Sequence, residues 1–524
     1  MQPQQFSKLR AFIWPVHSYE LKKCLPMGLM MFFVLFNYTL LRNTKDALVI
    51  THSGPEVIPF LKGGVLMPMS VLFVMAYTKL SNTLSRHSLF YICISAFVSF
   101  LTIFALYLFP NTASLHPDPA MIAQLKQEHP HFQHLISLYG IWTSVLFFVF
   151  AELWGAIALN LLFWKFANFI TRTNEAKRFY GIYAFLGHFA LIGAGYVSKW
   201  FCAMRADCST DQQAWGQYIN LTAATVVAVA IMIMLTYRWI CNNVLTDERH
   251  FDEAAAVRQQ KNNTKLKLSF RESVKHVLSS PVLGLISLLV MCYGFSMNLM
   301  GILWKKQLKL QFPDPVDYTN FMGSYSMSIG VLTILIIFFS KGIVEKFGWF
   351  RGAIVTPLVL LGSASAFFMF IFFREELTPL CALYSLTPLY VAAILGAVQH
   401  IMCKSAKYSL FDPTKEMAYI PLDAELKTKG KAAVDVTGYI FSKASGGYFS
   451  GAILMLFAIG DLMTIAPYLA VAVLVTACIW IMAVFKLNNR YKSMTEDPQP
   501  TTFTPANTDE KPMVGEAVVN TKTA

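Results

Sequence analysis

MGLMMFFVLFNYTLLRNTKDALVI, residues 27–50, is the stretch that decides the fold class of this 524-residue chain. It is apolar at its start and long enough to cross a bilayer, which takes about 20 residues. Its second half nevertheless carries Asn37, Arg42, Lys45 and Asp46. Ionisable groups inside a membrane helix are costly, so they usually face a water-filled cavity or a ligand. The stretch therefore predicts a membrane helix that lines a polar cavity.

A second copy of this pattern begins at residue 291 and reads MCYGFSMNLMGILWKKQLKLQF. In both copies an asparagine, Asn37 or Asn298, is followed eight residues later by a lysine, Lys45 or Lys306. Another pair of similar strings occurs further along, FANFITRTNEAKRFY at 166–180 and SAKYSLFDPTKEMAY at 405–419. The two pairs indicate an internal duplication.

The composition places the chain among membrane proteins, because 55% of its residues are hydrophobic and only 14% are charged. Apolar segments long enough to span recur along the sequence, which predicts an all-α polytopic membrane protein. We expect twelve transmembrane helices, at about 26–41, 58–78, 88–109, 135–164, 180–197, 217–237, 281–303, 321–340, 352–373, 378–401, 433–459 and 462–485.

Twelve segments and a duplication predict two six-helix halves of like orientation, which is the major-facilitator-like arrangement. Two unrelated bundles in series are the alternative. The predicted parts are a cytoplasmic amphipathic N-terminus at 1–25, halves at 26–237 and 281–485, a cytoplasmic linker at 238–280, and a disordered cytoplasmic tail at 486–524.

The net charge of +13 is distributed along the chain in a way that excludes a nucleic-acid-binding role. Most Lys and Arg residues fall in the two tails and in alternate loops, as the positive-inside rule requires. Both termini are therefore expected in the cytoplasm. The nine cysteines show no metal-binding spacing, and Cys202 and Cys208 could be either a disulfide or two free thiols.

Two charged residues lie near the middle of predicted helices, Glu152 in the fourth and Lys443 in the eleventh. Glu152 could be a polar clamp between helices, whereas a lysine that merely snorkels would lie near a helix end. Lys45 and Lys306 lie near such ends, where snorkelling remains open. Together Lys45, Lys306 and Lys443, with Arg42 and Lys305 as outer members, are expected to form a cationic lining that the single carboxylate of Glu152 cannot neutralise.

Such a cationic lining predicts a polyanionic ligand, because lysine and arginine bind phosphate oxygens through charge-assisted hydrogen bonds. The sequence has no phosphate-binding loop of the GxxxxGK[ST] type in a soluble segment, so we expect a nucleotide to be cargo rather than fuel. The amides of Asn298 and Asn160 are the candidates for base recognition. No cofactor and no metal site are predicted.

Several strings resemble the ATP/ADP translocases of obligate intracellular bacteria and plastids: RNTKDALVI (42–50), AELWG (151–155), EAKRFYG (175–181), WKKQLKLQFPDPVDYTNFMG (304–323), KYSLFDPTKEMAYIPLD (407–423) and KGKAAVDV (429–436). The resemblance covers nearly the whole chain except its C-terminal tail. It implies that Lys45, Glu152 and Lys443 are functional residues of the substrate path. One position departs from it: Gly301 stands where family members that exchange ATP for ADP commonly have a glutamate.

The resemblance implies a multi-pass transporter of the bacterial inner membrane that exchanges ATP for ADP by alternating access. The alternative is proton-coupled net import of nucleoside triphosphates with broader base selectivity, in which Glu152 and Gly301 would set the coupling. Phosphate and protons are further expected partners, besides the lipid bilayer. A membrane enzyme would need a clustered acid/base pair or metal ligands, and the sequence offers neither.

Overall fold

The computed structural model describes residues 15–247, 251, 275, 277, 280–422 and 430–496, and these residues form helices joined by short turns. The predicted linker and C-terminal tail lie largely outside this part. The first group of elements is η1 (Ser18–Glu20), α2 (Leu21–Ser53), η2 (Pro55–Val57), α3 (Ile58–Phe60), η3 (Leu61–Leu66), α4 (Met67–Thr83), α5 (Arg86–Ile103), η4 (Phe104–Leu108), α6 (Thr112–Leu115), α7 (Pro119–Glu128), η5 (Pro130–Phe132), α8 (Gln133–Gly140), α9 (Trp142–Trp154), η6 (Gly155–Phe163), α10 (Trp164–Ile170), α11 (Thr173–Ala203), η7 (Met204–Asp207) and α12 (Asp211–Asn243).

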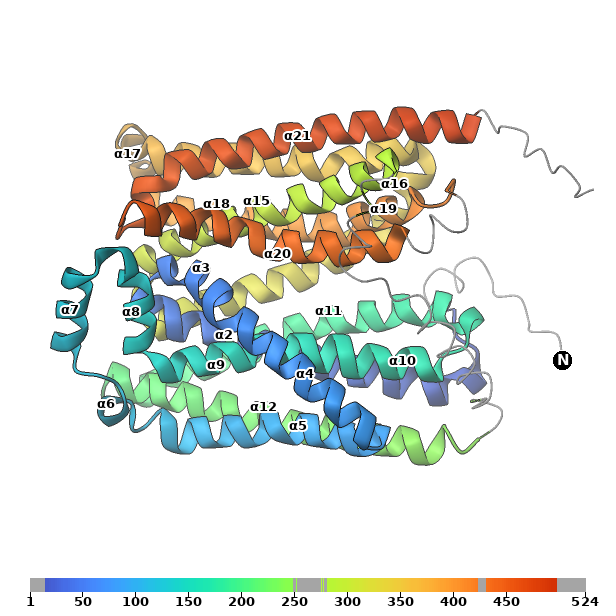
Figure 1. The fold of residues 1–524 in the computed structure, drawn as a ribbon, viewed down its shortest axis with the longest axis horizontal. Helices are drawn as coiled ribbons and strands as arrows, with labels where there is room; N and C mark the ends of the chain where they lie inside the picture. The colour runs from blue at the N-terminus through green and yellow to red at the C-terminus, as the bar shows by residue number, and fades with distance from the viewer. Residues whose placement is uncertain are drawn as a thin grey trace, which may run out of the picture.

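The second group is α15 (Pro281–Gln311), α16 (Pro315–Phe372), α17 (Arg374–Ala382), α18 (Pro388–Ala406), η8 (Lys407–Phe411), α19 (Asp412–Met417), α20 (Lys431–Leu456) and α21 (Leu462–Glu496). The two groups lie side by side with their long helices roughly parallel (Figure 1). In the first group α2 packs against α11 and α12, and in the second α15 packs against α20 and α21. The sequence-related helices α2 and α15 therefore hold corresponding places in two halves of a major-facilitator-like fold.

Eleven helices of the described chain are long and apolar enough to cross a membrane. The predicted eleventh segment corresponds to α20, a helix of 26 residues whose described part includes the apolar stretch Ser445–Leu456. The predicted eighth and ninth segments both lie in α16, which is interrupted at Gly348 by a positive φ of 79°. The tenth segment was predicted too early in the sequence, because its first residues belong to the separate helix α17. The spanning helix α18 begins only at Pro388, where the Thr387 side chain caps its N-terminus.

Glycines let the two halves approach closely where α11 meets α16. A side chain on Gly195 would place its Cβ 2.5 Å from the Gly323 carbonyl oxygen, and one on Gly330 would lie 2.8 Å from the His188 carbonyl oxygen. Missing side chains also bring α20 close to α3, where a Cβ on Gly451 would lie 3.0 Å from Pro59. Small residues serve this purpose at membrane helix interfaces because the backbones can then pack directly.

The connection between α5 and α9 folds back onto the second half. The ring nitrogens of His131 and His134 hydrogen-bond to the carbonyls of Met455 and Ile459, at 2.8 and 2.9 Å. Burial lowers the pKa of His134, whose ring also stacks on Phe60. Part of this connection therefore forms short helices that dock on the α20–α21 turn.

Ion pairs between the halves gather at this same end of the molecule. Lys306 Nζ lies 2.6 Å from Glu56 Oε1, and Arg205 lies 3.2 Å from Asp314 and 3.1 Å from Asp317. Among the described side chains, no ion pair joins the halves at the opposite end, where α21 finishes. The structure is therefore closed at the end that carries α7 and α8.

The glycine contact of α16 gives a prediction about stability. Gly330→Ala should destabilise the protein by about 1–3 kcal/mol, because its Cβ would overlap a backbone oxygen of α11. Gly362→Ala in the same helix is the matched control, since a Cβ there meets no atom within 4 Å. It should be neutral or stabilising, because alanine favours a helix over glycine. Thermal unfolding in detergent measures both, and equal midpoints for the two variants would contradict the close contact.

Candidate substrate cavity

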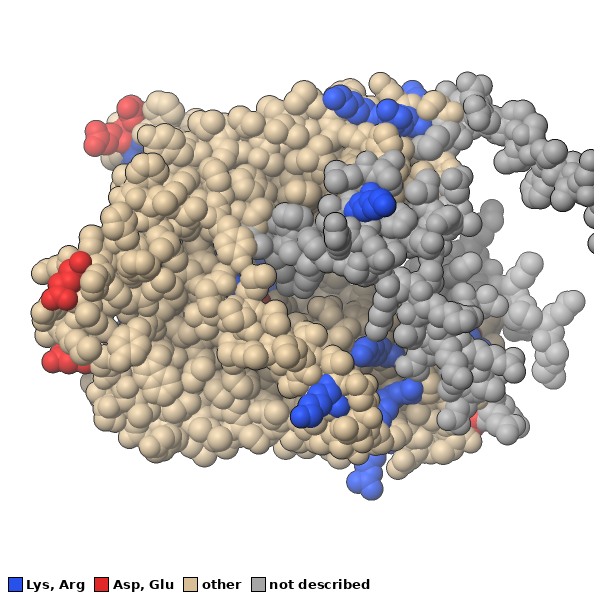
Figure 2. Space-filling view, in the orientation of Figure 1, with Lys and Arg blue, Asp and Glu red and all other residues tan. Residues whose placement is uncertain are grey.

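A cavity of about 670 Å³ lies between the two halves and is lined by α2, α3, η3 and α9 from the first half and by α15, α16, α18, η8, α19 and α20 from the second. The space-filling view shows the surface hollowed between the halves, away from α7 and α8 (Figure 2). Among the described residues, seven Lys and Arg side chains line the cavity against three carboxylates, which leaves an excess of four positive charges: Arg42, Lys45, Lys62, Lys305, Lys404, Lys407 and Lys415 against Asp46, Glu152 and Asp412.

Lys45 lies at the centre of a buried ion-pair network. Its Nζ is 2.8 Å from Asp46 Oδ1 and 3.0 Å from Glu152 Oε1, and it lies 3.9 Å above the centre of the Phe148 ring. The second oxygen of Asp46 accepts from Lys305 of α15 at 2.9 Å. The network thus joins α9, α2 and α15. The carboxylates of Asp46 and Glu152 balance most of the positive charge of Lys45.

Three other cations have no carboxylate partner among the described residues. Arg42 lies beside the Tyr38 ring, and its Nη2 is buried without a hydrogen-bond partner. Lys404 donates a hydrogen bond of 2.9 Å to the Tyr325 hydroxyl, and Lys62 has no ion pair within the described chain. Arg42, Lys62 and Lys404 line the same cavity, so their like charges repel one another. An anion that binds to these three cations does not have to displace a carboxylate of the described chain.

Sequence reasoning missed Lys62 and Lys404. Both lie inside or near predicted apolar segments, but no periodicity marked which side of the helix they occupy. The short π-helical turn η3 brings Lys62 into the cavity, and α18 places Lys404 there. The only signal in the sequence was a lysine among apolar residues, Lys62 in the predicted second helix and Lys404 just after the predicted tenth.

Aromatic rings form one wall of the cavity. Trp304 donates its indole N–H to the Ala393 carbonyl at 2.9 Å, and its ring packs against Tyr325 and His400 at 4.8 and 4.7 Å. Trp304 is only 2% exposed, so its faces are already covered. Tyr408 also lines the cavity and is 48% exposed, which leaves ring surface available to a ligand.

Asn298 lines the cavity, but its amide nitrogen is already hydrogen-bonded within the protein. Its amide nitrogen donates to the carbonyls of Gly294 and Ser442, both at 2.8 Å, and so ties α15 to α20. These helices approach so closely that residue 446 must lack a side chain: a Cβ on Gly446 would lie 2.7 Å from the Asn298 Cβ. Lys443 belongs to α20, next to the cavity residue Ser442, but its side chain lies outside the described part of the chain.

Two predicted site residues are not brought to the cavity. Lys306 points to the closed end, where it pairs with Glu56 and with Asp461 at 2.8 Å, and its neighbour Lys305 lines the cavity in its place. Successive residues of a helix lie about 100° apart, and here the Lys305 side chain faces the cavity while that of Lys306 is directed to Glu56. Asn160 is exposed in η6 and does not line the cavity.

Gly301 lies on the cavity wall, where a Cβ would come within 3.4 Å of His400 Nε2. An acidic side chain at this position would therefore enter the cavity beside His400. The described residues contain no group of three or more His, Cys, Asp or Glu side chains that could hold a metal ion. Cys202 and Cys208 are free thiols.

The sequence matches the family described as TLC ATP/ADP transporter over residues 1–491. It is 41% identical to ADP,ATP carrier protein 1 of Chlamydia pneumoniae, over 94% of this chain and 95% of that protein. It is 39% identical to ADP,ATP carrier protein 3 of Rickettsia bellii, over 93% and 98%, and to the chloroplastic ADP,ATP carrier protein 1 of Arabidopsis thaliana, over 93% and 77%.

The fold is similar to those of solved transporters with little sequence identity. A bacterial homologue of the iron transporter ferroportin superimposes with a TM-score of 0.55 at 11% identity, over 91% of this chain and 100% of that one. The nucleoside transporter NupG superimposes with a TM-score of 0.54 at 14% identity, over 88% and 99%. These likenesses concern the fold alone. The chain spans a membrane several times and belongs to the TLC ATP/ADP transporter family.

Proposed function

We propose that this protein exchanges ATP for ADP across a bacterial inner membrane by alternating access, with the nucleotide bound in the cavity between the halves. The observation that carries the proposal is the excess of four positive charges in a cavity to which both halves contribute. A nucleotide polyphosphate supplies the matching negative charge, and family membership supports adenine nucleotides as cargo.

Arg42, Lys62 and Lys404 are the best candidates for direct phosphate contacts, because no described carboxylate neutralises them. The buried Arg42 Nη2 can donate to a phosphate oxygen, and arginine suits phosphate because its donors form a planar fork. Lys45, Lys305 and Glu152 act behind them, by fixing the potential of the cavity and joining helices of both halves. Lys443 stays a candidate from the sequence.

The base has a smaller set of candidate contacts. Tyr408 offers an exposed ring in the cavity, and stacking on an aromatic ring is worth roughly 1–3 kcal/mol per base. The Asn298 side-chain oxygen is the amide group left for recognition, since its nitrogen is used by two carbonyls. Asn160 is not retained in this role.

Alternating access requires the closed end to open. The Lys306–Glu56 ion pair crosses between the halves there, and the docked α7 and α8 add hydrogen bonds. The acidic residues of α7 and α17 lie at this end, while Lys and Arg gather toward the other (Figure 2). By the positive-inside rule, this distribution supports cytoplasmic termini and a cavity open to the cytoplasm.

Uptake of labelled ATP into proteoliposomes tests the function as a whole. Vesicles preloaded with ADP should take up ATP much faster than empty vesicles, and collapse of an imposed proton gradient should leave this difference unchanged. Fast uptake into empty vesicles that depends on the proton gradient would instead identify net import.

Neutralising the unpaired cations should weaken ATP binding. Arg42→Gln and Lys404→Gln should each raise the apparent dissociation constant for ATP by a factor that corresponds to about 1.5–3 kcal/mol, because each removes a charged hydrogen bond. Lys165→Gln is the matched control, since Lys165 also donates to a tyrosine hydroxyl, that of Tyr77 at 3.2 Å, but lies outside the cavity. Unchanged affinity in both cavity variants would remove these residues from the site.

Gly301→Glu should alter the preference between the two nucleotides. The new carboxylate would reduce the positive excess of the cavity, and ATP carries more negative charge than ADP, so ATP affinity should fall more than ADP affinity. Gly301→Gln controls for side-chain volume. Competition of each nucleotide against labelled ADP measures the ratio, and an equal loss for both nucleotides in the Glu variant would contradict the electrostatic role.

Breaking the ion pair at the closed end should favour opening there. Glu56→Gln removes the charge that holds Lys306 across the halves, whereas Asp461→Asn removes a partner of the same lysine within one half. Hydrogen–deuterium exchange of the α8 backbone should therefore be faster in Glu56→Gln than in Asp461→Asn. Equal exchange in the two variants would show that this pair does not control the closed state.

A further inference from the structure

His400 of α18 lines the substrate cavity but belongs to neither its cations nor its carboxylates. Its side chain is 5% exposed, and its ring is stacked on Trp304 with the ring centres 4.7 Å apart. This contact depends on Gly396, one turn earlier in α18, because a Cβ there would overlap the Trp304 ring. The His400 ring is therefore held in a fixed plane at the cavity wall.

A hydrogen bond within α18 determines which ring nitrogen of His400 carries the proton. Nδ1 lies 3.0 Å from the Gly396 carbonyl oxygen. A carbonyl oxygen only accepts hydrogen bonds, so Nδ1 must be the donor, and in a neutral imidazole Nε2 is then an acceptor. The excess of positive charge among the described lining residues favours the neutral ring. His400 therefore presents a hydrogen-bond acceptor, Nε2.

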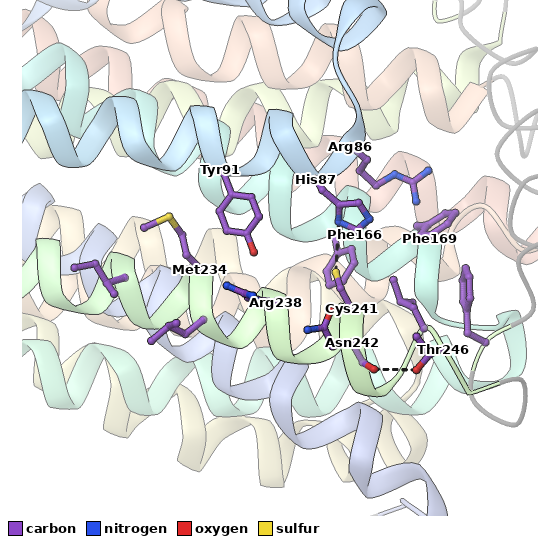
Figure 3. Close-up of a pocket in the computed structure, with 14 residues that line it drawn as sticks. Arg86, His87, Tyr91, Phe166, Phe169, Met234, Arg238, Cys241, Asn242 and Thr246 are labelled. Carbon is purple, nitrogen blue, oxygen red and sulfur yellow. Dashed lines mark hydrogen bonds between the residues drawn. The ribbon is translucent and has the colours of Figure 1, made fainter.

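His87 shows why the partner of Nδ1 matters. It lines a separate cavity of about 840 Å³, to which α5, α10 and α12 contribute (Figure 3). Its Nδ1 lies 3.1 Å from the Tyr237 hydroxyl, which can donate or accept, so this contact does not determine which nitrogen of His87 is protonated. The carbonyl partner of His400 removes that ambiguity.

The Nε2 atom of His400 is directed to the space beside Gly301 of α15. A Cβ at residue 301 would have Nε2 as its nearest described neighbour outside its own helix, at 3.4 Å. Gly301 and His400 both line the cavity. A ligand atom at hydrogen-bonding distance from Nε2 can therefore occupy the volume that a side chain at residue 301 would take.

An acceptor at this position selects the part of a nucleotide that can bind to it. Ionised phosphate oxygens only accept hydrogen bonds, whereas the ribose hydroxyls and the amino group of adenine can donate to Nε2. Lys404 lies one turn after His400 on the same face of α18, about 6 Å along the helix axis. The ribose is bonded directly to the phosphates, whereas the amino group lies at the far edge of the base. With the phosphates at Lys404, the spacing favours a ribose hydroxyl.

We propose that His400 Nε2 accepts a hydrogen bond from a ribose hydroxyl of the bound nucleotide, which makes the carrier selective for ribonucleotides over analogues that lack this hydroxyl. The inference rests on the proposed function, because that function places the phosphates at Lys404 and the other cavity cations. His400 is then a specificity residue, and Gly301 provides the space in which the hydroxyl lies.

Equilibrium binding of ATP and 2′,3′-dideoxyATP to the detergent-purified full chain tests the proposal. The wild-type protein should bind ATP about tenfold more tightly, the effect of one hydrogen bond in a buried site. His400→Phe keeps an aromatic ring but removes the acceptor, so it should lose affinity for ATP and bind the two nucleotides equally. The single 2′-deoxy and 3′-deoxy analogues of ATP then identify the hydroxyl.

His188→Phe is the matched control. The Nδ1 of His188 also donates to the carbonyl four residues earlier, that of Ala184 at 2.7 Å, but His188 does not line the cavity. The ratio of the two affinities should therefore stay at its wild-type value in His188→Phe. Gly301→Ala is a second test that leaves His400 in place, because its Cβ fills the space beside Nε2 and should lower the ratio. Thermal unfolding midpoints establish which variants are folded.

Three results would overturn the proposal. Equal binding of ATP and 2′,3′-dideoxyATP by the wild-type protein would show that the hydroxyls are not recognised, while the proposed function would stand. A wild-type ratio in both His400→Phe and Gly301→Ala would remove His400 from ribose recognition. If His400→Phe instead loses discrimination against inosine triphosphate, which lacks the amino group, and keeps the ribose preference, Nε2 contacts the base. A wild-type protein that binds neither ATP nor ADP would refute the proposed function as well.

Discussion

The structure depends on the need to neutralise charges that are buried between membrane helices. Asp46 meets this need for two lysines at once, Lys45 from its own helix and Lys305 from the other half. Removing one member of such a network leaves an uncompensated buried charge, which costs roughly 3–5 kcal/mol. The network therefore fixes α2 against α9 and α15, and the remaining cations of the cavity are arranged around it.

The positive residues are therefore of two kinds, those paired with a carboxylate and those without a carboxylate partner among the described residues. Lys45, Lys305 and Lys306 are balanced by carboxylates and act chiefly between helices. Arg42 and Lys404 lack such partners within the described chain and face the cavity. A site built in this way keeps its structural charges satisfied when empty, while the unsatisfied ones create the attraction for an anion.

Much of this arrangement could be predicted from the sequence. The class of fold, the duplication and the places of Arg42, Lys45, Glu152, Asn298 and Gly301 on the cavity follow from charged or special residues in apolar segments. The choice between Lys305 and Lys306 could not be made, because neighbouring residues of one helix differ only in the face they occupy. Lys62, Lys404 and the docking of α8 depend on contacts between distant segments, which no local pattern reports. The boundaries of the two halves and of the linker stay predictions.

The π-helical turns of the fourth and tenth membrane helices have a consequence for movement. Glu152 lies just before η6, and Lys407 and Tyr408 lie within η8, so equivalent helices of both halves widen beside the cavity. A π turn contains one residue more than an α turn requires. If that extra residue passes to the next turn, the side chains in between rotate by about 100° while nearly every backbone hydrogen bond is kept. Such a shift would reorient Glu152 in one half and Lys407 and Tyr408 in the other without unwinding a helix in the membrane.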